Sequence, residues 1–156
     1  MPTLAHDVIV DLGRSGAYGP SRVLAQRADL VLLVVRGTLR SVNAARGRIG
    51  MLRQVLRVIR SSHAALGILL IAEGTYGHRE VEEALETRVV ATLPCRPGEA
   101  AVLSDGAPQD RRFTKGPLLR AAREARTPIR QQAASRRQRL YLSPMQQRLA
   151  EVRRAR

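Results

Sequence analysis

An acidic residue and a set of glycines follow the first apolar stretch of the chain. Residues 6–11 form a short β-branched run that ends at Asp11, and Gly13, Gly16 and Gly19 come next at regular intervals. An aspartate at the end of a strand can hold Mg²⁺ through a water molecule. An aspartate before a glycine turn more often caps that turn. From the residues alone, we favour the cap over the metal ligand.

The glycine pattern itself is that of a loop. It fits neither the G-x-G-x-x-G fingerprint nor the phosphate-binding loop G-x-x-x-x-G-K-[ST], so we interpret residues 13–19 as a switch-like loop. Arg14 in this loop can contact a phosphate, although a solvated loop arginine is the commoner case. The three histidines lack the spacing of metal ligands, and no serine has the G-x-S-x-G context of a hydrolase.

The charge of the chain is concentrated in its last third. Lys and Arg number 27 against 13 Asp and Glu, which gives a net charge of +14. Residues 111–156 hold 14 basic and 2 acidic residues, hence +12 of that total. Such a segment is expected to bind polyanions mainly by counterion release. It can meet nucleic acid or an anionic membrane surface, or remain a solvated extension. The arginines that we expect to bind polyanions are Arg130, Arg136, Arg137, Arg139, Arg148, Arg153, Arg154 and Arg156.

Composition excludes several classes of protein. The single cysteine, Cys95, cannot form an intramolecular disulfide or a cysteine-based zinc site. The apolar runs at 30–35 and 66–72 are too short to span a bilayer, and the first ten residues show no basic leader. We therefore expect a cytoplasmic protein without a transmembrane segment, associated with the nucleoid or a membrane surface if the basic segment binds there.

Apolar runs alternate with amphipathic segments along the first 126 residues. Strands are expected at 6–11, 28–35, 66–72 and 89–93, and helices at 20–27, 38–60, 79–86, 97–104 and 117–126. This alternation predicts an α/β fold with a mostly parallel sheet of about four strands and helices on both faces. The loops at 11–19, 36–38, 73–78 and 94–98 are then expected to share the carboxyl edge of the sheet. Residues 1–126 form the expected domain, and 127–156 a basic extension with a linker at 127–138 and a terminal helix at 144–155.

The ordered motifs resemble the C-terminal half of MinD/ParA-type P-loop ATPases. They are Asp7-Val-Ile-Val-Asp11-Leu-Gly13, the run Ala28-Asp29-Leu-Val-Leu-Leu-Val-Val35, the strand at 67–72, and Arg88-Val-Val-Ala-Thr-Leu-Pro94. The residues of these motifs are most similar to those of the actinobacterial MinD-like proteins of the CpaE/TadZ branch, where residues 118–122 match the final domain helix. The resemblance implies part of a Rossmann-like P-loop NTPase (SIMIBI) fold. It also implies a Walker B and switch role for Asp11, Gly13 and Arg14, with Asp11 as the metal position. Nucleotide contacts would come from Glu73, Gly74, Pro94 and Arg96.

The family's deviant Walker A loop has no counterpart in the sequence. We therefore expect no nucleotide cofactor for the isolated chain, with ATP and Mg²⁺ entering only if a missing half completes the site. The expected function is that of a non-hydrolysing binding or regulatory partner in partitioning, positioning or pilus and secretion assembly. It would dock on a full-length relative or a secretion ATPase through the arginine face of the helix at 38–60. The alternatives are a nonspecific nucleic-acid-binding protein and a fragment of an active ATPase whose N-terminal half is encoded upstream.

Overall fold

Three apolar runs of the sequence form one parallel sheet. A computed structural model describes residues 7–13, 19, 21–57, 66–109 and 111–141, and for residues 57, 111, 112 and 136–141 it describes the backbone alone. The strands are β1 (Val31–Arg36), β2 (Leu66–Ala72) and β3 (Val89–Pro94), in the order β1-β2-β3. Both strand pairs are parallel, as the alternation of strands and helices predicts.

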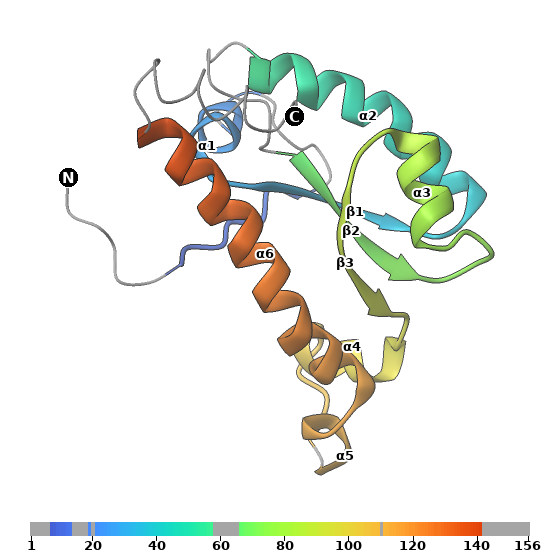
Figure 1. Cartoon of the computed structure of the whole chain (residues 1–156). Helices are drawn as coiled ribbons and strands as arrows, with labels where there is room; N and C mark the ends of the chain where they lie inside the picture. The colour runs from blue at the N-terminus through green and yellow to red at the C-terminus, as the bar shows by residue number, and fades with distance from the viewer. Residues whose placement is uncertain (1–6, 14–18, 20, 58–65, 110, 142–156) are drawn as a thin grey trace, which may run out of the picture.

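Helices connect and cover the strands (Figure 1). They are α1 (Ser21–Arg27), α2 (Leu39–Arg57), α3 (His78–Leu85), α4 (Pro97–Ser104), α5 (Arg111–Thr114) and α6 (Pro117–Tyr141). The apolar stripe of α2 is buried as predicted, since Val42, Ala45, Ile49 and Leu56 are each at most 5% exposed. None of the described helices is long and apolar enough to cross a membrane.

The core lies on one face of the sheet. Val35, Ile68 and Leu70 pack there against α2 and α3. On the opposite face, α6 lies against β3 (Figure 1). Side chains alternate between the two faces of a strand, and Val34 on the face away from α2 is 60% exposed. The face of β1 away from α2 is therefore open to solvent at Val34, although an aliphatic run such as that at 28–35 is typical of a strand buried on both faces.

The expected first strand does not form. Residues 7–12 have no regular secondary structure, and Val8, Ile9 and Val10 are 71%, 94% and 52% exposed. β-branched residues favour a strand only where a neighbouring strand and a covered face are available. Among the described residues, the sheet therefore has three strands rather than about four.

The expected linker at 127–138 is helical instead. α6 runs from Pro117 through Pro128 to Tyr141 without a break. A proline inside a helix removes one backbone hydrogen bond, but Pro128 and Ile129 are half-buried. Packing of α6 on β3 therefore overrides the polar composition from which a linker was predicted.

Candidate functional site

Two loops close on each other at the carboxyl ends of β1 and β2. The backbone N–H of Tyr76 donates to the carbonyl of Gly37 at 3.0 Å. Gly74 has φ +90°, and a Cβ on it would lie 2.5 Å from the carbonyl oxygen of Gly37. Only glycine fits this close approach without strain. The two loops are therefore joined through their backbones.

An ion pair crosses the same edge of the sheet. Nη1 of Arg36, the last residue of β1, lies 3.1 Å from Oε2 of Glu73. This carboxylate oxygen makes no hydrogen bond of good geometry among the described residues, so the contact is electrostatic. The backbone N–H of Arg36 donates to Oγ of Ser41 at 2.9 Å, which ties the edge to the first turn of α2. Of the predicted nucleotide contacts, Glu73 and Gly74 are thus engaged within the protein.

Asp11 lies at the other end of the sheet. The neighbouring Leu12 packs against a cluster formed by Ala25 of α1, by Val31 at the start of β1 and by Leu56 near the end of α2. Oδ1 of Asp11 accepts the backbone N–H of Gly13 at 2.8 Å, which is the capped turn favoured from the sequence. The expectation that the loop at 11–19 shares the carboxyl edge does not hold for residues 11–13. With no strand at 6–11, nothing carries Asp11 along the sheet to that edge.

A cavity of about 570 Å³ opens beyond the carboxyl end of β3. Arg96, the N-cap residue of α4, lines this cavity together with Cys95. The other lining residues are Pro97, Gly98, Glu99, Val102, Ala107, Pro108, Phe113, Gly116 and Pro117. Pro94 is paired with Ala72 at the end of β3 and does not line the cavity. Of the predicted nucleotide residues, Arg96 therefore lines this cavity, Glu73 and Gly74 lie at the loop junction, and Pro94 lies at the end of β3.

Glu99 joins the cavity wall to α6. Its Oε2 accepts the backbone N–H of Leu118 at 2.9 Å, in the first turn of α6. The first N–H groups of a helix have no partner within the helix, so a carboxylate from α4 satisfies one of them. The carboxylate also lies in the favourable field of the helix N-terminus. Glu99 thus has a structural partner within the cavity wall.

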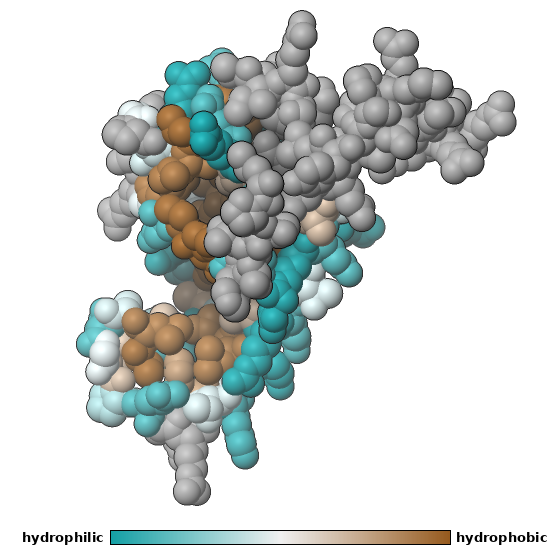
Figure 2. Space-filling model, turned by 90° about the vertical axis from the view of Figure 1, so that its left-hand side faces the viewer, coloured by the Kyte–Doolittle hydropathy of each residue, from teal (hydrophilic) through white to brown (hydrophobic). Residues whose placement is uncertain are grey.

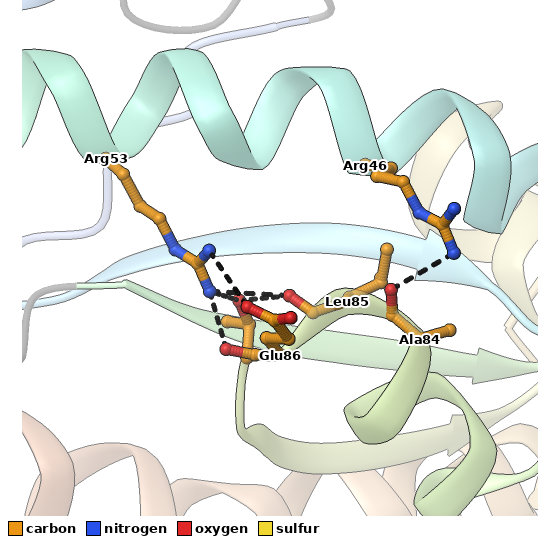
Figure 3. Close-up of polar contacts among 6 residues, drawn as sticks. Arg46, Arg53, Ala84, Leu85 and Glu86 are labelled. Carbon is orange, nitrogen blue, oxygen red and sulfur yellow. Dashed lines mark hydrogen bonds and ion pairs between the residues drawn. The ribbon is translucent and has the colours of Figure 1, made fainter.

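Two arginines of the expected docking face on α2, Arg46 and Arg53, contact the C-terminal end of α3 (Figure 3). Nη2 of Arg53 donates to the carbonyl of Glu86 at 2.5 Å and to Oγ1 of Thr87 at 3.1 Å. Arg46 donates to the carbonyl of Ala84 at 3.3 Å. These groups satisfy carbonyls at the C-terminal end of α3, where helices lack internal donors. The expected docking face also includes Arg57, of which the backbone alone is described, and Arg60, which lies outside the described residues.

Within residues 117–135 of α6, where side chains are described, four arginines are exposed: Arg120, Arg123, Arg126 and Arg130. Their spacing of three and four residues places them along one side of the helix. The buried Ala125 and the half-buried Gln132 lie on the other side, toward the sheet. Nε and Nη2 of Arg130 both lie 2.6 Å from Oδ2 of Asp7. We call these four residues the α6 arginine stripe.

The remaining polyanion candidates lie along or beyond this helix. Arg136, Arg137 and Arg139 belong to the described backbone of α6. Arg148, Arg153, Arg154 and Arg156, the expected helix at 144–155 and Arg14 lie outside the described residues. Arg120, Arg123 and Arg126 were not singled out from the sequence, although their helical spacing was a signal that could have found them.

The described residues bring no metal-binding cluster together. Among them, no group of three or more His, Cys, Asp or Glu side chains could hold a metal ion. The ion pair between Arg36 and Glu73 was also missed from the sequence, where a charged residue at the end of each apolar run was the available signal.

No family model, curated protein or solved structure matches the chain.

Proposed function

We propose that this chain is a non-hydrolysing relative of the MinD/ParA-type ATPases that acts by binding a partner. One observation carries the proposal, namely the separation of the candidate nucleotide residues. Asp11 lies at the amino end of the sheet, whereas Glu73 and Gly74 lie at the carboxyl end. Phosphoryl transfer needs the metal-binding acid beside the phosphates, and this arrangement does not place it there.

The proposed partners are a full-length MinD/ParA-like protein or a secretion ATPase. The chain would regulate or position that partner in partitioning, cell positioning or pilus and secretion assembly. Support comes from the ordered motifs shared with the family and from the parallel α/β sheet in which they lie. ATP and Mg²⁺ belong to this proposal only where a second polypeptide completes the site.

An ATP turnover assay tests the proposal. The purified chain is compared with Asp11→Ala and with Asp105→Ala, a matched removal of an exposed carboxylate after α4. We expect all three proteins to show the same background rate. Hydrolysis by the unaltered chain that Asp11→Ala abolishes and Asp105→Ala preserves would overturn the proposal.

A second candidate function is nonspecific binding of nucleic acid, and the α6 arginine stripe favours it. The exposed side of α6 over residues 120–135 carries arginine, threonine, glutamine, serine and alanine, with a single acid at Glu124. Arginines and short polar side chains are the usual phosphate contacts of DNA-binding surfaces. Membrane insertion requires large apolar side chains on the same surface, and this part of the helix exposes none. This candidate implies a cytoplasmic protein associated with the nucleoid.

Salt-dependent binding to a fluorescent DNA duplex tests the second candidate. Each phosphate contact contributes about 0.9 to the slope of log K against log salt. The double variant Arg123→Gln/Arg126→Gln should therefore lower the slope by about 2. Arg40→Gln, an exposed arginine of α2, is the matched control and should leave the slope unchanged. Equal loss in both variants, or binding that salt does not weaken, would contradict this function.

A further inference from the structure

The outer edge of β1 carries no strand among the described residues. β1 pairs with β2 on one side, and the sheet order places it at the end of the sheet. An edge strand presents a row of backbone N–H and C=O groups that another strand can pair with. What such an edge recognises is therefore an extended polypeptide.

β1 lacks the features that usually protect a sheet edge. Its residues are five aliphatics followed by Arg36, with no proline and no lysine. Its pairing with β2 runs in continuous register over the whole strand, so no bulge twists the edge away. Arg36 is itself paired with Glu73. Natural edge strands use charges, prolines or bulges to prevent pairing with other chains, and β1 has none of these along its length from Val31 to Val35.

Exposed apolar side chains lie on β1 and on α1, and α1 packs against Val31 at the start of β1 through Ala25. Val34 in the middle of β1 is 60% exposed, and Val23 and Leu24 of α1 are 52% and 50% exposed. Figure 2 shows hydrophobic surface at the height of α1 and β1. Contiguous apolar patches on a protein surface mark interaction sites. Pairing at this edge would bury part of the patch.

The distribution of charge favours a second copy of the chain as the occupant. Residues 1–110 carry 13 basic and 11 acidic residues, a net charge of +2, whereas residues 111–156 carry +12. α6, which holds much of that excess, lies against β3 at the opposite side of the sheet. Two copies can therefore approach through β1 while the α6 arginine stripe of each copy stays on the β3 side of its own sheet. A run of aliphatic residues is also self-complementary, because apolar side chains meet apolar side chains in either direction.

We propose that two copies of this chain pair antiparallel through their β1 strands to form a continuous six-stranded sheet, three strands from each copy. Because the paired strands are identical and antiparallel, the two-fold axis that relates the copies stands perpendicular to the sheet. Both α6 helices then lie on the same face. Five inter-strand spacings separate the two β3 strands, about 24 Å at about 4.8 Å each. The dimer thus displays two arginine stripes on one surface, and it stands whether or not the proposed function holds.

Sedimentation velocity on the nuclease-treated full chain tests the proposal, with Val34→Lys as the main variant. Val34 is exposed in the monomer and lies near the axis in any register that pairs most of β1, so lysine places like charges beside each other. We expect the dimer to weaken at least about tenfold, which is about 1.4 kcal/mol. Val34→Thr keeps a β-branched shape and should keep the dimer. Leu103→Lys, at a position 67% exposed on α4, should also keep it.

Two further measurements complete the test: the salt dependence of the dimer and amide hydrogen exchange in β1. Salt should strengthen the dimer, because it screens repulsion between two chains of charge +14. Amide exchange in the peptide spanning β1 should slow as protein concentration rises, which reports the pairing without any substitution. A monomer at all concentrations, a dimer insensitive to Val34→Lys, or β1 exchange independent of concentration would each overturn the proposal.

Discussion

Arg53 should stabilise the fold through backbone carbonyls rather than through its carboxylate partner. Its Nη2 donates to the carbonyl of Glu86 at 2.5 Å, to that of Leu85 at 3.4 Å and to Oγ1 of Thr87 at 3.1 Å. The carboxylate of Glu86 is 3.9 Å away on a side chain that is 82% exposed. Exposed ion pairs of this kind contribute little. The hydrogen bonds at the end of α3 therefore dominate (Figure 3).

The expected cost of Arg53→Met follows from these contacts. Methionine keeps the aliphatic stem of the side chain and removes the donors. Hydrogen bonds to charged groups are worth about 1.5–3 kcal/mol when well buried. The Arg53 side chain is 39% exposed, so water can replace part of the lost bonding. We expect the free energy of unfolding to fall by about 1–2 kcal/mol, measured by urea unfolding followed by circular dichroism.

Two matched variants separate the possible causes of that loss. Arg46→Met removes a single 3.3 Å hydrogen bond to Ala84 and should cost less than about 0.5 kcal/mol. Glu86→Gly removes the carboxylate but keeps the carbonyl that Arg53 contacts, and it relieves the left-handed φ of +46° at this position. It should be neutral or stabilising by up to about 1 kcal/mol. A loss in Glu86→Gly as large as that in Arg53→Met would refute the reasoning.

Three further substitutions are tested by the same unfolding assay; two are expected to lower the free energy of unfolding and one to raise it. Gly74→Ala should destabilise by about 2 kcal/mol or more, because its φ of +90° and the carbonyl of Gly37 at 2.5 Å exclude a Cβ; an unchanged stability would show that the loops are not joined there. Gly50→Ala, with no atom within 4 Å of a new Cβ inside α2, should stabilise by up to about 1 kcal/mol, and a loss would mean that this side of α2 is covered. Glu99→Ala should cost about 1 kcal/mol, since the N–H of Leu118 loses its acceptor; a neutral result would argue against that cap.

Periodicity predicted the part of the fold that is held by burial. The stripe of α2 and the apolar runs of β2 and β3 lie where the sequence placed them, because each buries its aliphatic side chains in the same core. The run at 6–11 was misjudged because β propensity is local, whereas a strand also requires a neighbour. The linker expected at 127–138 was misjudged because polar residues remain helical where Pro128 and Ile129 rest against the sheet.

The candidate site was less predictable than the fold. A loop's position depends on which strand precedes it. Because residues 7–11 do not form the expected strand, Asp11 lies at the amino end of the sheet and not at the carboxyl end. Spacing along α2 indicated an arginine face but not its neighbour, and α3 brings its terminal carbonyls to Arg46 and Arg53. Contacts between elements distant in sequence, such as Arg36 with Glu73, follow from the register of the strands, which composition does not encode.

Calorimetric titration of the purified chain with ATP in the presence of Mg²⁺ tests most directly whether the protein acts without a nucleotide site. The same titration is run on Asp11→Ala. We predict no heat of binding that depends on Asp11, because Asp11 caps its own turn at Gly13 and lies at the opposite end of the sheet from Glu73. Micromolar binding that Asp11→Ala abolishes would contradict this prediction and would mean that the two ends of the sheet come together on nucleotide binding.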